Sequence, residues 1–332
     1  MNTLIIKLGA LGDVVISTPI IDAIARAHAD GTVWLLTSPA YTALFADRPH
    51  LRVFGCERRG WRAMLRMIFW IRSQRFDRVF DLQSSERSAV VCALSGIRWR
   101  AGGHAHFPYG VHPAEKWRGQ YHIFDHQNAL LAAAGLPIAE PRPHLAVAAA
   151  DDAAVHDWLA RHTLTTGGFV VIHAGTSRGG EAKRWPHFGD LAAALESRGL
   201  RVVWSGGPAD IEINATLARR AGIDSLGFFT VPRLVALGRQ ARFAVSNDSG
   251  PMHVLSASGC PVYGLFGPTD WRRNHALGQR ERVIASTAPC AGCGTRSRDP
   301  ERHTCLSGIS AATVIDRLER DGLLPPAGEL RV

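Results

Sequence analysis

An aspartate near the amino terminus has the residue type and spacing of a general base. Residues 7–13 read Lys-Leu-Gly-Ala-Leu-Gly-Asp and follow an apolar run directly. The glycines permit a tight turn and a close backbone approach by a ligand, and their spacing differs from the dinucleotide pattern G-x-G-x-x-G. At the start of a helix, the Asp13 carboxylate can accept a proton from a hydroxyl nucleophile. The alternative is an N-cap that only stabilises the helix.

A second loop, residues 173–186, offers donors for phosphate oxygens. Thr176 and Ser177 provide hydroxyls and amides, and Lys183 adds a positive charge on a long side chain. Lysine is rare here, since only 3 of the 38 basic residues are lysines. The loop therefore predicts a phosphate contact. The alternative is a flexible surface loop with ordinary charges.

A third loop, residues 246–253, reads Ser-Asn-Asp-Ser-Gly-Pro-Met-His between a strand and a helix. Ser249 can cap that helix, and the amides from Gly250 onward favour an anion. Asp248 and His253 are spaced to contact the same ligand. The pattern predicts a second part of one binding site.

Residues 205–212 form another turn from strand to helix, with Asp210 and Glu212. Acidic residues at such turns bind ribose hydroxyls in nucleotide-binding folds. Simple N-capping by Asp210 is an equally good interpretation.

Three cysteines near the carboxyl terminus have the spacing of metal ligands. Cys290 and Cys293 form a C-x2-C pair, Cys305 follows, and His303 is a candidate fourth ligand. This spacing suits a structural zinc or iron ion. Unmetallated thiols are the alternative.

A basic segment accounts for most of the net charge. Residues 51–78 contain eight arginines against Glu57 and Asp77, a local charge of +6 in a chain of +9. Arg59, Arg62 and Arg66 follow helical spacing, with apolar residues between them. A basic amphipathic helix can rest on an anionic membrane or meet a phosphorylated glycolipid. The alternative is a helix that packs its apolar face on a sheet and leaves an arginine edge in water.

Alternating strands and helices must position these loops, which predicts an α/β fold with parallel sheets. The proline-rich stretch 135–149 breaks the alternation, so we expect two Rossmann-like domains, residues 1–165 and 166–332, that face each other across a cleft. Apolar runs predict strands at 3–8, 33–37, 79–82, 169–174, 201–205, 243–246 and 261–266, and helical patterns lie at 20–29, 151–162, 190–198 and 211–221.

The composition excludes several classes of protein. Hydrophobic residues make up 46% of the 332 residues and charged residues 20%, which excludes a disordered chain. No apolar run reaches the roughly 20 residues of a membrane span, and 6 cysteines do not make a secreted disulfide framework. These features predict a soluble cytoplasmic protein.

The ordered set of motifs resembles the heptosyltransferases of glycosyltransferase family nine, which build the inner core of lipopolysaccharide. The motifs are LGALGD, GTS…KRWP, SGGPAD and SNDSGPMH…GCPVYGLFGPTDW, and residues 81–88 resemble the acceptor-side motif of that family. The resemblance implies the GT-B fold, with an acceptor-binding first domain and a nucleotide-sugar-binding second domain. It also makes packing of the C-terminal helix on the first domain a possibility to test.

The resemblance implies an inverting transfer of heptose from ADP-heptose. Asp13 corresponds to the general base, and Lys183 offsets charge on the departing ADP. Cations and helix amides suffice for a diphosphate leaving group, so no cofactor is expected for catalysis. The donor-binding positions are Thr176, Ser177, Asp210, Glu212, Asp248, Ser249, Gly250 and His253, and the acceptor-binding positions are Arg59, Arg62, Arg66 and Arg87.

The expected partners are ADP-heptose, a phosphorylated lipopolysaccharide core acceptor and the cytoplasmic face of the inner membrane, where the enzyme would be peripheral. One alternative is a heptosyltransferase that acts on a protein. Another is a non-catalytic basic module with a metal knuckle that binds nucleic acid. The nucleotide-type loops would have no use in such a module, so nucleic acid is not expected as a partner.

Overall fold

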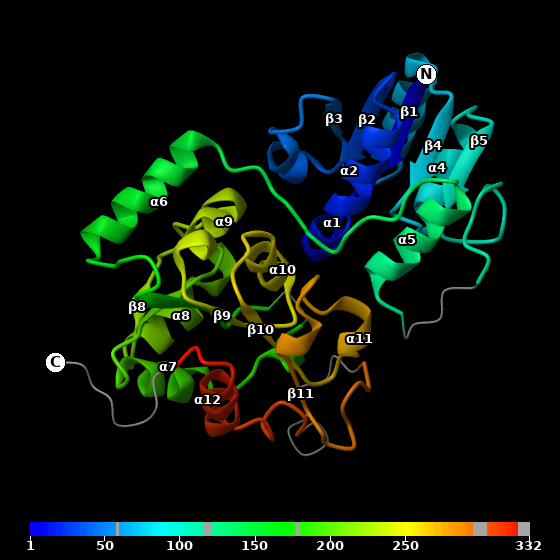
Figure 1. Ribbon diagram of the computed structural model, residues 1–332. Helices are drawn as coiled ribbons and strands as arrows, with labels where there is room; N and C mark the ends of the chain where they lie inside the picture. Colours follow the sequence, from blue (N-terminus) through cyan, green and yellow to red (C-terminus); the bar gives the residue numbers. More distant parts are fainter. Residues whose placement is uncertain (58–59, 116–120, 177–179, 295–303, 325–332) are drawn as a thin grey trace. The chain divides into compact units, whose positions relative to one another are not determined.

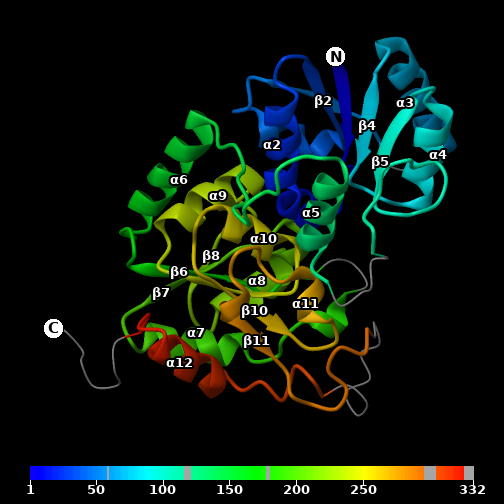
Figure 2. The ribbon, with the colours of Figure 1, turned by 45° about the vertical axis from the view of Figure 1, so that its right-hand side comes forward.

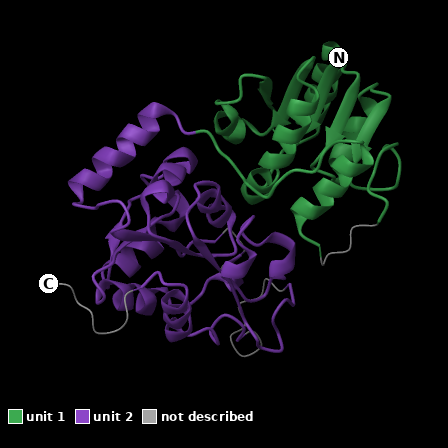
Figure 3. Ribbon diagram, viewed as in Figure 1, with its two compact units in different colours: residues 1–146 green, residues 147–332 purple. Residues whose placement is uncertain are grey.

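The computed structural model describes residues 1–57, 60–115, 121–176, 180–294 and 304–324. The chain forms two compact units, residues 1–146 and 147–332 (Figure 3). The second unit includes α6 (Ala149–Arg161), which packs on α9 (Val231–Gln240). The helix that precedes residue 166 therefore belongs to the second compact unit.

The first unit is built on a five-stranded parallel sheet with the order β3-β2-β1-β4-β5 (Figure 1). Central strands such as β1 and β4 are buried on both faces, as expected for apolar runs in a parallel sheet. The strands are β1 (Asn2–Ile6), β2 (Thr32–Thr37), β3 (Leu51–Gly55), β4 (Arg78–Asp81) and β5 (Trp99–Gly102).

Helices cover both faces of this sheet. In Figure 2, α2 and α5 lie on one face, and α3 and α4 lie side by side on the other. The helices are α1 (Leu11–Ile16), α2 (Thr18–Ala27), α3 (Trp61–Gln74), α4 (Glu86–Leu94) and α5 (Ile123–Ala133), with a 3-10 helix at Pro39–Phe45.

The second unit has a six-stranded parallel sheet with the order β11-β10-β9-β6-β7-β8. Its strands are β6 (Phe169–His173), β7 (Arg201–Trp204), β8 (Ile223–Asp224), β9 (Ala244–Asn247), β10 (Val262–Phe266) and β11 (Val283–Ala285). Its remaining helices are α7 (Phe188–Glu196), α8 (Ile211–Ala218), α10 (Gly250–Ala257), α11 (Trp271–Asn274) and α12 (Ala311–Arg320), with 3-10 turns at Glu181–Lys183, Pro208–Asp210 and Arg280–Arg282.

The C-terminal helix α12 belongs to the core of the second unit. It packs on α7, and its Val314, Ile315 and Leu318 are buried with the apolar residues of that unit. No helix among the described residues is long and apolar enough to cross a membrane.

Each sheet has one point where the strand order reverses. It lies between β1 and β4 in the first unit and between β6 and β9 in the second. In open parallel sheets, ligands bind outside the carboxyl ends of the strands at such a point. The segments singled out in the sequence lie at the carboxyl ends of these four strands, at residues 7–13, 81–88, 173–186 and 246–253.

Candidate functional site

The carboxyl ends of β6 and β9 bring two of the predicted loops together. The strands are neighbours, with His173 in register with Ser246. Thr176 follows the first strand, and Asp248 follows the second. The two loops that the sequence predicted to bind phosphate therefore meet at one point of the sheet.

A buried asparagine, Asn247, fixes the relative position of these loops. Its Nδ2 donates hydrogen bonds to the carbonyls of Ala174 and Gly175, at 2.9 and 3.2 Å. Its Oδ1 accepts one from the amide of Trp185 at 3.0 Å. One side chain thus connects the end of β9 with both ends of the loop after β6.

Asp248 binds the lysine that the sequence singled out. The Nζ of Lys183 lies 2.8 Å from Oδ2 of Asp248, and Nδ2 of Asn274 donates to Oδ1 at 2.8 Å. The carboxylate is almost fully buried, whereas the lysine is partly exposed. The ammonium group is therefore held at the edge of the site, where its remaining hydrogens can reach a bound anion.

The first turn of α10 follows Asp248. Ser249 is the N-cap residue, but its side chain does not cap the helix, contrary to the sequence-based expectation. Its Oγ lies 3.4 Å from Oγ of Ser246 instead. Gly250 and the buried His253 are on α10 itself, so the positive end of a helix points at this position.

Two threonine hydroxyls here are buried and have no hydrogen-bond partner within the described part of the chain. Thr176 is one, and Thr269, after β10, is the other. A buried hydroxyl normally finds a partner, so each is a candidate ligand contact. Ser177, the neighbour predicted to bind the donor, lies outside the described residues.

The two acidic candidates after β7 differ in exposure. Asp210 is buried, accepts a hydrogen bond from the amide of Gly207 at 3.0 Å, and lies against Gly175, where a Cβ would stand 2.2 Å from its Oδ1. It makes no side-chain cap to α8. Glu212 is exposed in the first turn of α8. Asp210 is engaged within the protein, whereas Glu212 faces solvent.

His173, at the end of β6, is a buried neutral group below this site. Its Nδ1 bonds the carbonyl of Ser205 at 3.0 Å. Burial lowers the pKa of His173, although the Asp210 carboxylate acts in the opposite direction. This histidine therefore joins the β6 and β7 loops as an uncharged side chain.

In the first unit, Asp13 is the third residue of α1 and is partly exposed. Its Oδ2 accepts a hydrogen bond from the amide of Ala10 at 3.3 Å, so Asp13 stabilises the helix start from within the helix. The N-cap position belongs to Ala10. The other carboxylate oxygen of Asp13, Oδ1, has no hydrogen-bond partner among the residues the structure describes, which leaves it able to accept a proton.

A buried lysine lies beneath this loop. The Nζ of Lys7 donates to the carbonyl of Leu82 at 3.0 Å. Burial lowers the pKa of Lys7, and the nearby Asp13 and Asp81 carboxylates oppose this shift. Gln83, which comes two residues after the neighbouring strand β4, holds this loop in place, since its Oε1 accepts a hydrogen bond from the amide of Leu8 at 2.9 Å.

The motif at residues 81–88 begins with a fully buried aspartate at the end of β4. Asp81 accepts hydrogen bonds from the amides of Gln83 and Ser84, both at 3.0 Å, and from the hydroxyl of Tyr109. Burial raises the pKa of Asp81. Asp81 shapes the turn that leads into α4.

The candidate acceptor arginines lie on α3 and α4. Arg62 and Arg66 are exposed on α3. Arg87, on α4, donates to the carbonyl of Gly60, next to the start of α3. Arg59 lies outside the described residues. The helix predicted for the basic segment is confirmed, and its arginines face solvent.

Cys305 lies against Gly267, next to the Cys290–Cys293 loop. Burial raises the pKa of the Cys305 thiol, and the thiols of Cys290 and Cys293 act in the same direction. The Cys290–Cys293 loop is held in place, because the amide of Gly292 donates to the carbonyl of Gly267 at 2.9 Å. In the described part of the chain, no three cysteine, histidine or acidic side chains form a group that would hold a metal ion. His303 is not among the described residues.

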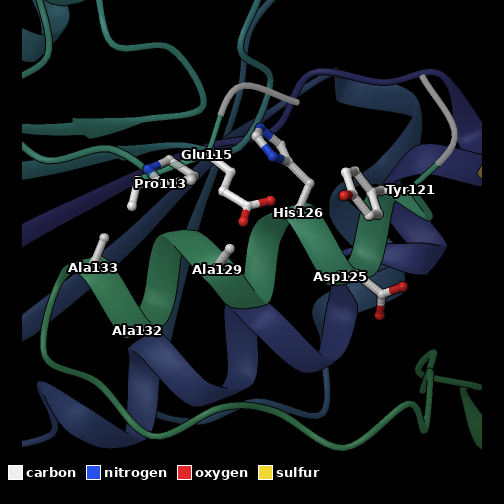
Figure 4. Close-up of a pocket in the computed structure, with 9 residues that line it drawn as sticks. Pro113, Glu115, Tyr121, Asp125, His126, Ala129, Ala132 and Ala133 are labelled. Atoms are coloured by element: carbon white, nitrogen blue, oxygen red, sulfur yellow. The ribbon is translucent and has the colours of Figure 1, made fainter. Parts of the chain in front are cut away.

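A pocket of about 400 Å³ lies along α5 in the first unit (Figure 4). Glu115 and His126 line it together with a row of alanines, and burial lowers the pKa of His126. None of the sequence-predicted site residues lines it.

Comparison with known proteins decides the family. The model of glycosyltransferase family 9 (heptosyltransferase) matches residues 64–302, well over half of the 332 residues. The chain belongs to glycosyltransferase family 9. It is 29% identical over 233 residues to lipopolysaccharide heptosyltransferase 2 of Escherichia coli K12, a match that covers 64% of this chain and 66% of that protein.

Solved structures of this glycosyltransferase family share the fold. A family 9 glycosyltransferase from Veillonella parvula superimposes with a TM-score of 0.80 and 19% identity, over 96% of both chains. The ADP-heptose lps heptosyltransferase II of E. coli gives a TM-score of 0.74 and 21% identity, over 96% of this chain and 98% of that one. The two parallel α/β units are those of the GT-B fold, as predicted from the motifs.

Proposed function

We propose that this glycosyltransferase moves heptose from ADP-heptose to a lipopolysaccharide core acceptor, with inversion at the anomeric carbon. The observation that carries the proposal is the group at the reversal point of the second sheet. Three features lie together there: the Lys183–Asp248 ion pair, the start of α10, and the hydroxyl of Thr176, which has no hydrogen-bond partner among the described residues. A hydroxyl, an ammonium group and helix amides are the donors that a nucleoside diphosphate needs.

The names of the relatives agree with this chemistry. The E. coli relative is a lipopolysaccharide heptosyltransferase, and the structure with the same fold is an ADP-heptose lps heptosyltransferase. We assign the diphosphate to Thr176, Ser177, Lys183 and the α10 amides from Ser249 and Gly250, and the heptose to Asp248 and His253. Glu212 is the better candidate for the ribose, because Asp210 is already engaged by Gly207.

Inversion requires a single displacement. The acceptor oxygen attacks the anomeric carbon opposite the diphosphate, the bond from that carbon to the diphosphate oxygen breaks, and ADP leaves with the electron pair. The acceptor proton passes to Oδ1 of Asp13. Carboxylates are weak bases at neutral pH, so the proton moves late, as the new sugar bond forms. Lys183 balances charge on the departing ADP.

The acceptor side of the proposal uses basic residues of the first unit. We assign the phosphates of the acceptor to Arg59, Arg62, Arg66 and Arg87, because guanidinium groups bind phosphate in bidentate fashion. The acceptor is a glycolipid, so the reaction takes place at the cytoplasmic face of the inner membrane.

A transfer assay tests the function. The purified chain is incubated with ADP-heptose and a core acceptor that lacks the added heptose, with ADP-glucose as the control donor. We expect a product one heptose heavier by mass spectrometry and stoichiometric release of ADP. Transfer of heptose to a protein acceptor but to no core acceptor would overturn the assigned acceptor. Absence of heptose transfer to any acceptor would overturn the reaction.

We also propose that Cys290, Cys293 and Cys305 bind a structural zinc or iron ion, with His303 as the fourth ligand. The support is that Cys305 Sγ lies against Gly267, whose carbonyl also accepts a hydrogen bond from the Cys290–Cys293 loop, since thiolates suit both metals. Elemental analysis of the untagged protein against a Cys290→Ser/Cys293→Ser variant tests it. We expect about one metal ion per chain in the wild type only. Equal metal content in both proteins would end the proposal.

A further inference from the structure

Helix α3 has an exposed apolar stripe in addition to its buried face. Its buried face consists of Ala63, Met67, Ile68 and Ile71, which pack on the sheet. On the solvent side, Trp61 is 65% exposed, Leu65 39% and Phe69 69%. These three residues are spaced by four, so they lie on one side of the helix. Packing within the unit explains the buried face and leaves this stripe unexplained.

The neighbouring helix also exposes apolar side chains. On α4, Val90 is 43% exposed and Leu94 50%. The helices contact each other at both ends, because Arg72 of α3 donates to the carbonyl of Leu94 at 3.4 Å and Arg87 donates to that of Gly60. Figure 2 shows them side by side on one face of the sheet. We call Trp61, Leu65, Phe69, Val90 and Leu94 the α3–α4 patch.

Positive charge accompanies the patch. Arg62, Arg66 and Arg72 are exposed on α3, and no acidic residue occurs between Trp61 and Gln74. Two acidic residues lie nearby, Glu86 at the start of α4 and Glu57 shortly before α3. Arg62 lies over the ring of Trp61, 5.3 Å from the ring centre. Exposed aromatic rings bordered by arginines suit a partner that has an apolar interior and an anionic outer layer.

We propose that the α3–α4 patch docks this enzyme on an anionic lipid bilayer. The rings of Trp61 and Phe69 enter the boundary between headgroups and acyl chains, where aromatic side chains are favoured. Arg72, which is not among the arginines assigned to the acceptor, binds lipid phosphate at the same depth, since its long stem can lie along apolar surface. The inference deepens the proposed function, because it assigns the residues that hold the enzyme where a glycolipid acceptor is found.

Vesicle binding tests the docking. The full chain is sedimented with vesicles of phosphatidylglycerol and phosphatidylcholine, and with phosphatidylcholine alone. We expect binding to anionic vesicles that salt weakens, and a loss of at least about tenfold in the partition coefficient of Trp61→Ser/Phe69→Ser. Leu226→Ser, which removes a 73% exposed leucine from the second unit, is the matched control and should bind as the wild type does.

Three outcomes would overturn the inference. They are equal binding of the double variant and the wild type, equal binding to neutral and anionic vesicles, and self-association of the wild type that the double variant loses in sedimentation velocity. The last outcome would make the patch a contact for a second copy of the chain.

A separate assay distinguishes this inference from the proposed function. With a short acceptor that has no lipid chains, the double variant should transfer heptose as fast as the wild type, and it should be slower only on acceptor embedded in vesicles. If the wild type transfers heptose to neither acceptor yet binds anionic vesicles through the patch, the proposed function fails and the docking stands.

Discussion

At the scale of single residues, the position of Asp13 suits both a structural role and a chemical role. One carboxylate oxygen holds the amide of Ala10, which fixes the side chain, and the other has no described partner. The buried Lys7 ammonium group lies close enough for Asp13 to affect its pKa. An oriented carboxylate with one oxygen available is what a general base requires. Helix capping and base catalysis are therefore compatible here.

The first prediction separates these two roles. Asp13→Asn keeps an oxygen that can accept from Ala10 and removes the base. We expect transfer to fall by roughly 10²–10⁴-fold, the usual contribution of general base catalysis. ADP affinity, measured by calorimetry, should stay within about twofold, because every assigned ADP contact lies in the second unit. Transfer at wild-type rate would show that Asp13 is only a structural residue.

The Lys183–Asp248 pair is the basis of the second prediction. Lys183→Met removes the cation assigned to the diphosphate, so ADP affinity should fall by about 10- to 100-fold, in the range of one charge-assisted contact. Lys183→Arg keeps the charge and should recover part of that affinity. Calorimetric titration with ADP and with adenosine measures both. If adenosine binding falls as much as ADP binding, the lysine does not act on the phosphates.

At the scale of elements, the strands predicted from the sequence are the central ones. The predictions miss β3, β5, β8 and β11, which are the edges of the two sheets. These edge strands are partly exposed, so they lack a continuous apolar run: β3 contains Arg52 and β5 contains Arg100, while β8 has two residues. A continuous apolar pattern indicates a strand that is buried on both faces of the sheet, and an edge strand is less buried.

The same limit explains which site residues the sequence indicates. Loops after central strands are recognisable, because glycine, acid and hydroxyl residues follow an apolar run. Asn274 gives no such signal, since its role is to hold Asp248, 26 positions earlier. Asn247 lies within a recognised motif, yet its function depends on Trp185, 62 positions away. Partners that only the fold brings together cannot be found from spacing.

The third prediction tests how Asn247 couples two elements. Asn247→Ala removes bonds to Ala174, Gly175 and Trp185 and leaves the buried Trp185 amide unpaired. One unpaired buried group costs about 1–3 kcal/mol. We expect that loss in the free energy of unfolding of the second unit, measured by urea titration with hydrogen exchange, and weaker ADP binding.

A matched asparagine in the first unit provides the control. Asn128 also bonds backbone groups with both ends of its amide, to the amide and the carbonyl of Ala139. Asn128→Ala should destabilise the first unit and leave ADP affinity unchanged. Equal effects of the two substitutions on ADP affinity would mean that Asn247 does not position the loops.

At the scale of the whole molecule, each unit has a hydrophobic core of its own. One core includes Leu4, Met67 and Val91, and the other includes Ile172, Leu191 and Val314. All residues assigned to ADP belong to the second unit, whereas Asp13 and the arginines assigned to the acceptor belong to the first unit. The residues proposed for the donor and those proposed for the acceptor thus belong to different compact units of one chain.

The fourth prediction follows from this division. A ligand that binds only the folded state stabilises that state by about 2.7 kcal/mol at 100 times its Kd, and every contact assigned to ADP lies in the second unit. Saturating ADP should therefore slow hydrogen exchange in peptides of residues 147–332, most strongly in β6, β9 and the first turn of α10, and leave β1 to β5 unchanged. Lys183→Met at the same ADP concentration should show less protection in the same peptides. Protection that reaches β1 and the Asp13 loop would mean that the first unit also binds the nucleotide, and the division of donor and acceptor residues would have to be redrawn.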